Sequence, residues 1–257
     1  MRASTILTCC FLLLLQATYT AREAHPGEKI DPAALVAAGF DHYRGLASQA
    51  DVEMIIHRPT WERSMRMEAW TRGTDESLIR ITAPAKDVGN GTLKKGREMW
   101  TYNPKVNRVL KLPPALMSQS WMGSDFSNND LAKSDSILND YVHTLKGTET
   151  HEGQTVYHIT ATPKPDAPVV WGLQELKIRA DHVILSQEFF DEDLAPVKKM
   201  TGHEIQMMGG RVFPKVWKMQ ETDKPAQYTQ LIYHRLSFLD SLPDRTFTRN
   251  ALTRGRR

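Results

Sequence analysis

Short segments in which polar and apolar residues alternate follow one another from Val52 to Phe238. This alternation is typical of half-buried β-strands, because successive side chains of a strand point to opposite faces of a sheet. Turn-forming residues such as Asn103-Pro104-Lys105 and Gly209-Gly210 separate the segments. Strands at such short spacing, without helical patterns between them, predict a mainly β fold with a strongly curved antiparallel sheet or partial barrel. The expected strands are 52–58, 63–72, 78–83, 97–102, 106–112, 141–149, 155–161, 173–179, 183–191, 197–208, 211–220 and 227–238.

A helix is expected before the first strand. Asp31 and Pro32 form a helix start, because an aspartate side chain accepts free backbone N–H groups and proline fits the first helical position. Apolar residues recur at helical spacing from Leu35 to Tyr43, and we expect the helix to continue to about Gln49. No internal repeat or low-complexity linker follows, so residues 21–257 are interpreted as a single domain.

Residues 1–20 predict a secretory signal peptide. Arg2 precedes an apolar run from Ile6 to Leu15, which is about half the length that a membrane-spanning helix needs. Cleavage is expected between residues 17 and 24, and an uncleaved anchor is the alternative. Both cysteines, Cys9 and Cys10, fall inside this run, so the mature chain has none and must derive its stability from a core. The predicted location is the periplasm.

The charge of the chain gives little indication of a charged partner. The formal net charge is +3, which is too small to favour nucleic acid or an anionic membrane surface. Basic residues gather at the C-terminal end, and we interpret them as a solvated tail. They are Arg249, Arg254, Arg256 and Arg257.

The connection between residues 112 and 131 is unusually apolar. Loops normally run over the surface and stay polar, so its large apolar side chains must cover either the core or a cavity. Ser127 and Asp130 in the same stretch predict a helix N-cap with an acidic first turn. The apolar residues of the connection expected to contact a ligand are Leu116, Met117, Trp121, Met122 and Phe126.

The strands that precede this connection are rich in methionine and tryptophan. The chain has 11 methionines and 6 tryptophans, and methionine is common on surfaces that accept varied apolar partners. These residues either fill an ordinary core or line an apolar cavity beneath the connection. The candidate wall residues in the strands are Met54, Ile56, Met65, Met67, Met99 and Trp100.

Enzymatic patterns are missing from the sequence. The histidines show no metal-ligand spacing, the mature chain offers no thiol nucleophile, and no Gly-x-Ser-x-Gly elbow occurs. The acidic loop from Asp125 to Asp130 lacks the glycine and the glutamate of a calcium loop. We therefore expect neither enzymatic activity nor a metal or other cofactor.

Several motifs resemble the outer membrane lipoprotein-sorting protein family, which is related to the periplasmic lipoprotein carrier LolA. The likeness covers roughly residues 35–240. It is carried by Trp70-Thr71-Arg72-Gly73, Gly91-Thr92-Leu93-Lys94, the run from Met99 to Pro104 and, most specifically, Trp121-Met122-Gly123-Ser124-Asp125-Phe126.

This resemblance implies an unclosed β-barrel with helices over an apolar cavity that takes up acyl chains of a lipoprotein or lipid. It also implies transfer toward the outer membrane, with an inner-membrane transporter and an outer-membrane acceptor as partners. An exported lipid-binding sensor or an assembly subunit of a membrane transport complex, without shuttling, is the alternative. The gating arginine of the family is left open among Arg66, Arg80 and Arg97.

Overall fold

The computed structural model describes residues 30–254. The expected signal peptide, its cleavage site, Arg256 and Arg257 lie outside the described residues. The described residues from Asp31 onward form one compact unit.

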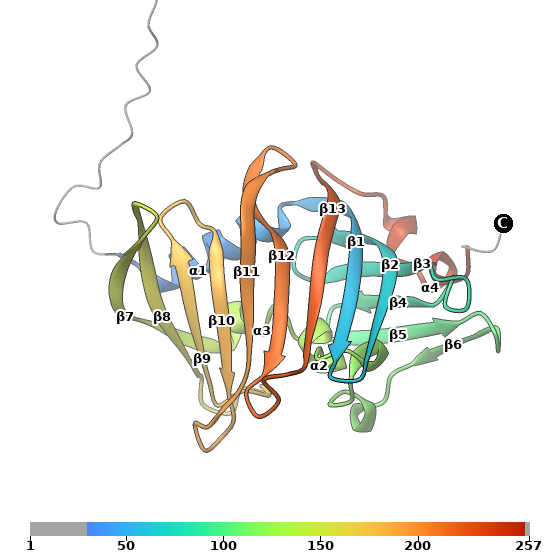
Figure 1. Cartoon of the computed structure of the whole chain (residues 1–257), viewed down its shortest axis with the longest axis horizontal. Helices are drawn as coiled ribbons and strands as arrows, with labels where there is room; N and C mark the ends of the chain where they lie inside the picture. Colours follow the sequence, from blue (N-terminus) through green and yellow to red (C-terminus); the bar gives the residue numbers. More distant parts are fainter. Residues whose placement is uncertain (1–29, 255–257) are drawn as a thin grey trace, which may run out of the picture. The chain divides into compact units, whose positions relative to one another are not determined.

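A single large antiparallel sheet dominates the fold (Figure 1). Its 13 strands follow the order β6-β5-β4-β3-β2-β1-β13-β12-β11-β10-β9-β8-β7. β6 and β7 are the two edges, so the sheet is not closed into a barrel, and the predicted fold class is confirmed. The strands are β1 (Ala47–Arg58), β2 (Trp61–Arg72), β3 (Glu76–Ala83), β4 (Gly91–Lys95), β5 (Glu98–Asn103), β6 (Arg108–Lys111), β7 (Tyr141–His151), β8 (Gln154–Pro163), β9 (Leu173–Arg179), β10 (Ile184–Phe190), β11 (Pro196–Met208), β12 (Arg211–Glu221) and β13 (Tyr228–Leu239).

Short helices complete the fold. Three α-helices are α1 (Pro32–Arg44), α2 (Asn128–Ala132) and α3 (Ser136–Asn139), and a fourth, α4 (Arg249–Thr253), follows the sheet. The 3₁₀ turns are η1 (Pro114–Leu116), η2 (Trp121–Gly123) and η3 (Asp244–Phe247).

Helix α1 begins where the sequence predicts and ends earlier. The Asp31 side chain accepts hydrogen bonds from the backbone N–H groups of Ala33 (2.9 Å) and Ala34 (3.3 Å). The helix ends at Arg44, because Gly45 has a φ of +61°, a left-handed conformation that glycine adopts without strain. The expected extension to Gln49 is therefore wrong, and those residues instead begin β1.

The two faces of the sheet near β2–β4 carry different partners. On the inner face Ala69, Ile79 and Thr92 lie in register across β2, β3 and β4. Helices α1, α2 and α3 belong to this side, behind the strands in Figure 1. On the outer face Leu78 and Leu93 pack beneath η3 and α4.

Two expectations from the sequence are corrected here. Arg249 starts α4, in which Ala251 and Leu252 are buried, so it is not part of a solvated tail. Gly91 is the first residue of β4, a strand that is absent from the expected set. A Cβ atom at Gly91 would lie 2.9 Å from the Leu252 side chain, so close packing against α4 explains the glycine.

Candidate functional site: a cavity beneath the β6–β7 connection

A cavity of about 250 Å³ lies between the inner face of the sheet, α1 and the β6–β7 connection (residues 112–140). The sheet contributes apolar side chains from β1–β3 and β10–β13, including Met67, Met200 and Leu231. The connection contributes Trp121 and Phe126. The connection thus forms one wall of the cavity, and a ligand inside would contact mainly carbon atoms.

The aromatic residues of the cavity wall are packed against one another. The Tyr43 ring stacks on Phe213 at 5.4 Å between centroids and meets Trp217 edge-on at the same distance. The hydroxyls of Tyr43 and Tyr233 share a hydrogen bond of 2.9 Å, and burial raises the pKa of Tyr233 well above its ordinary value. Tyr233 therefore stays neutral at physiological pH and adds no charge to the cavity.

The eleven residues predicted to contact a ligand fall into three groups. Those that line the cavity are Met67, Trp121 and Phe126. Those that form or pack against the neighbouring core cluster are Met54, Ile56, Met65, Met99, Met117 and Met122.

The other two lie elsewhere. Leu116 is half-buried, and its carbonyl accepts a hydrogen bond of 2.9 Å from the Asn128 amide. Trp100 lies on the outer face and packs against the cluster beneath α4. A ligand in the cavity would therefore reach only the first group.

The Trp-Met-Gly-Ser-Asp-Phe element holds the connection against the sheet. The Trp121 indole N–H donates to the Thr92 hydroxyl at 3.0 Å, and the Ser124 hydroxyl donates to the Trp121 carbonyl at 2.7 Å. Met122 (φ +55°) and Gly123 (φ +78°) adopt left-handed conformations that turn the chain sharply. The element therefore buries Trp121 while bringing the next residues back to the sheet.

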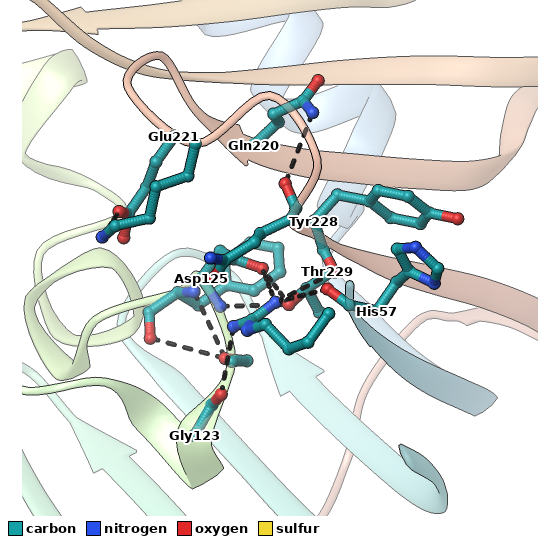
Figure 2. A network of polar contacts seen from close by, with 12 residues as sticks. His57, Gly123, Asp125, Gln220, Glu221, Tyr228 and Thr229 are labelled. Atoms are coloured by element: carbon teal, nitrogen blue, oxygen red, sulfur yellow. Dashed lines mark hydrogen bonds and ion pairs between the residues drawn. The ribbon is translucent and has the colours of Figure 1, made fainter. Parts of the chain in front are cut away.

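Asp125 anchors this element to the ends of β1 and β13 (Figure 2). Its carboxylate accepts hydrogen bonds from the Arg58 guanidinium (3.1 Å) and the Thr229 hydroxyl (2.5 Å). Arg58 also donates to the backbone carbonyls of His57 (2.8 Å), Tyr228 (3.3 Å) and Gly123 (3.3 Å). The exposed fractions of the Arg58 and Asp125 side chains are 14% and 3%, so this pair is shielded from water.

Four aspartates of the connection, spaced five residues apart, each pair with a cation of the sheet. The pairs are Asp125–Arg58, Asp130–Lys198, Asp135–Lys94 and Asp140–Arg97. The Lys94 side chain is almost fully buried, and burial lowers its pKa while its 2.6 Å contact with Asp135 opposes that shift. The connection is thus attached to the sheet by charged contacts at regular intervals. The attraction within each ion pair is weaker in water than in a dry interior.

Asp130 also stabilises helix α2 locally. Its backbone N–H donates to the Ser127 hydroxyl at 3.2 Å, and its carboxylate accepts from the Ser127 N–H at 2.6 Å. This reciprocal arrangement is a capping box. The helix start predicted from these two residues is confirmed.

The arginines left open as gating residues do not line the cavity. Arg80 donates to the Ala251 carbonyl on the outer face (2.6 Å), and Arg66 lies in a separate surface hollow beside Glu68. Arg97 is largely exposed and pairs with Asp140. Arg58, the last residue of the expected strand 52–58, was not among these candidates, although it is the arginine that holds the Trp-Met-Gly-Ser-Asp-Phe element.

Comparison with known proteins places the chain in a family. A family model described as "Uncharacterized protein" matches residues 73–254. The chain belongs to this family. No curated protein matches the sequence.

Solved structures show the same fold. A DUF1329 family protein from Desulfovibrio piger is 23% identical, with a TM-score of 0.76 over 87% of this chain and 100% of the other. A LolA superfamily protein from Nitrosomonas europaea (21%, TM-score 0.72) matches over 87% and 100% of the two chains. An outer membrane lipoprotein-sorting protein domain from Vibrio parahaemolyticus (21%, TM-score 0.75) matches over 87% and 98%. The chain therefore has the LolA-like fold that the sequence motifs suggested.

Two further findings concern the described residues alone. Among residues 30–254, no helix is long and apolar enough to cross a membrane. Within the same range, no three potential metal-ligating side chains come together.

Proposed function

We propose that this chain is a periplasmic carrier that holds an acyl chain of a lipoprotein or lipid in the cavity and transfers it toward the outer membrane. The observation that carries the proposal is an apolar cavity with the β6–β7 connection as one of its walls. Charged pairs attach this connection to the sheet. The likeness in fold to a LolA superfamily protein and to a lipoprotein-sorting domain supports it. An inner-membrane transporter and an outer-membrane acceptor are the partners that such a role requires.

The cavity volume limits what fits without opening. A cavity of about 150 Å³ accommodates benzene, so about 250 Å³ accommodates roughly ten carbon atoms. Burying ten methylenes stabilises a complex by about 8 kcal/mol before the costs of association. A longer chain, or several chains, requires the β6–β7 connection to move away from the sheet. Loading and release are therefore coupled to the charged pairs that hold the connection.

Filling the cavity tests the binding site directly. Ala69 lines the cavity from β2, and replacing it by phenylalanine would occupy space that an acyl chain needs. We expect Ala69→Phe to lower the affinity for a fluorescent acyl probe at least about tenfold while circular dichroism stays unchanged. Thr148→Phe, at an exposed position of β7, is the matched control and should bind normally. Equal binding by the wild type and Ala69→Phe would contradict the proposed site.

Transfer separates the carrier from a sensor or assembly subunit. Both need the same cavity, but only a carrier delivers its cargo. The protein should be loaded from donor vesicles that contain a labelled acyl lipid and then mixed with acceptor vesicles. Label that reaches the acceptor faster than in the absence of protein supports the carrier. Label that stays bound to the protein contradicts it and favours the sensor.

A further inference from the structure

Two cations line the apolar cavity without an ionic partner. Arg44 lies at the end of α1 and Lys133 directly follows α2. Arg44 donates to the Ser134 hydroxyl at 2.9 Å, and Lys133 donates to the Pro168 carbonyl at 2.9 Å. Within residues 30–254, neither forms a salt bridge. Arg44 thus bonds to the residue that follows Lys133 in the sequence, and both residues line the cavity.

The neighbouring carboxylates are already engaged. Asp130 pairs with Lys198, and Asp135 pairs with Lys94. The other two aspartates of the connection pair with Arg58 and Arg97, so the four carboxylates that hold the connection leave none for Arg44 or Lys133. The Arg44 contact is partly buried, whereas that of Lys133 is exposed. A partly buried cation without a counter-ion is unfavourable beside an apolar cavity. An anionic group on a ligand would remove this cost.

We infer that the cavity selects a single-chain anionic amphiphile, whose carboxylate or phosphate binds Arg44 and Lys133 while its hydrocarbon chain fills the apolar part. The inference rests on the proposed function and specifies its ligand class. Arg44 uses one of its five N–H donors in the described contacts, and its planar guanidinium matches two oxygens of a carboxylate or phosphate. Met67 and Leu231 line the apolar part of the same cavity.

Ligands of one chain length and different head groups test this inference. Decanoate, monodecyl phosphate and decanol all have about the ten carbons that the cavity accommodates. Binding to the purified mature chain should be measured by calorimetry at low salt. We expect both anions to bind at least about tenfold more tightly than decanol, because a charge-assisted hydrogen bond outweighs a neutral one by about that factor. The anion that binds more tightly then identifies the source as a fatty acid or a single-chain phosphate ester.

The variant pair Arg44→Gln and Lys133→Gln, combined in one protein, removes the two cations. It should bring the anions to the affinity of decanol and leave decanol binding unchanged. Lys105→Gln combined with Arg108→Gln changes the net charge equally at exposed positions near the β5–β6 turn and should keep the preference for anions. Raising the salt from about 50 to 500 mM should weaken only the anions, which provides a second readout in the wild type.

The outcomes separate the inference from the proposed function. Equal affinity of decanol and the anions for the wild type would overturn the head-group site and leave the acyl-binding cavity standing. Binding of none of the three would overturn both. A loss of anion preference in the control pair as large as in the cavity pair would assign the effect to net charge and overturn the inference.

Discussion

The contact between Arg58 and Asp125 offers the sharpest test of how the β6–β7 connection is held. Replacing Arg58 by methionine keeps most of the side-chain length and removes the guanidinium. Asp125, which is only 3% exposed, then keeps the Thr229 hydroxyl as its remaining side-chain partner. Three backbone carbonyls also lose a donor, among them that of Gly123 in the connection.

The expected effect follows from the burial of the pair. Removing one partner of a buried charge pair typically costs about 3–5 kcal/mol. Since Thr229 still donates to Asp125, we take the lower end, about 3 kcal/mol. The contact is lost when the connection lifts from the sheet, so the variant should favour local opening by a factor on the order of 100.

Hydrogen exchange followed by mass spectrometry measures this opening. The backbone N–H of Asp125, which donates to the Thr229 hydroxyl of β13 at 3.0 Å, reports on the separation of the connection from the sheet. Its exchange should accelerate on the order of 100-fold in Arg58→Met.

An exposed arginine supplies the matched control. The Arg235 side chain is 83% exposed and pairs with Asp51, so Arg235→Met should change little. Unchanged exchange in the connection of Arg58→Met would refute the reasoning. An equal acceleration in β8–β10 would refute it too, because it would indicate global rather than local destabilisation.

Two further predictions concern stability. Burial lowers the pKa of His143 below its ordinary value of 6.5, so the unfolded chain takes up this proton at a higher pH than the folded chain. The free energy of unfolding should therefore fall as the pH drops below about 6.5. In urea titrations at several pH values, His143→Gln should make the free energy of unfolding depend less on pH, and an unchanged dependence would contradict this. The second prediction concerns packing: a Cβ atom at Gly172 would lie 2.3 Å from the Asp191 carbonyl oxygen, so Gly172→Ala should lower the free energy of unfolding by about 1–3 kcal/mol. Gly147→Ala, with open space around it, should leave the urea midpoint nearly unchanged, and equal effects of the two variants would contradict the packing argument.

Local patterns predicted most of the strands and the start of the first helix. The alternation of side chains and the turn residues located twelve of the strands, and the bounds of Leu173–Arg179 agree fully. β4 was missed because it is short and places Thr92 and Lys94 on the buried face, where the pattern expects apolar residues. Lys94 is tolerated there because it bonds to Asp135 and the Thr74 carbonyl.

The position of the cavity depended on information that local patterns do not contain. Alternation puts the neighbours Met99 and Trp100 on opposite faces of β5, and both faces are covered, one by the core cluster and the other by the cluster beneath α4. Periodicity alone therefore cannot say which face carries a cavity. The charged pairs were equally inaccessible, since Arg58 and Asp125 are 67 residues apart in the sequence.

The pairing of β1 with β13 in the middle of the sheet has a consequence for folding (Figure 1). Strands β1–β6 and β7–β13 are each continuous in the sequence, and within the described sheet these two sets of strands pair with each other only at this seam. Asp51 and Arg235, which face each other across it, are 184 residues apart. So high a contact order slows folding. A chain that is synthesised from its N-terminus keeps the edge of β1 unpaired until β13 has emerged, and this edge therefore remains open to chaperones until that point.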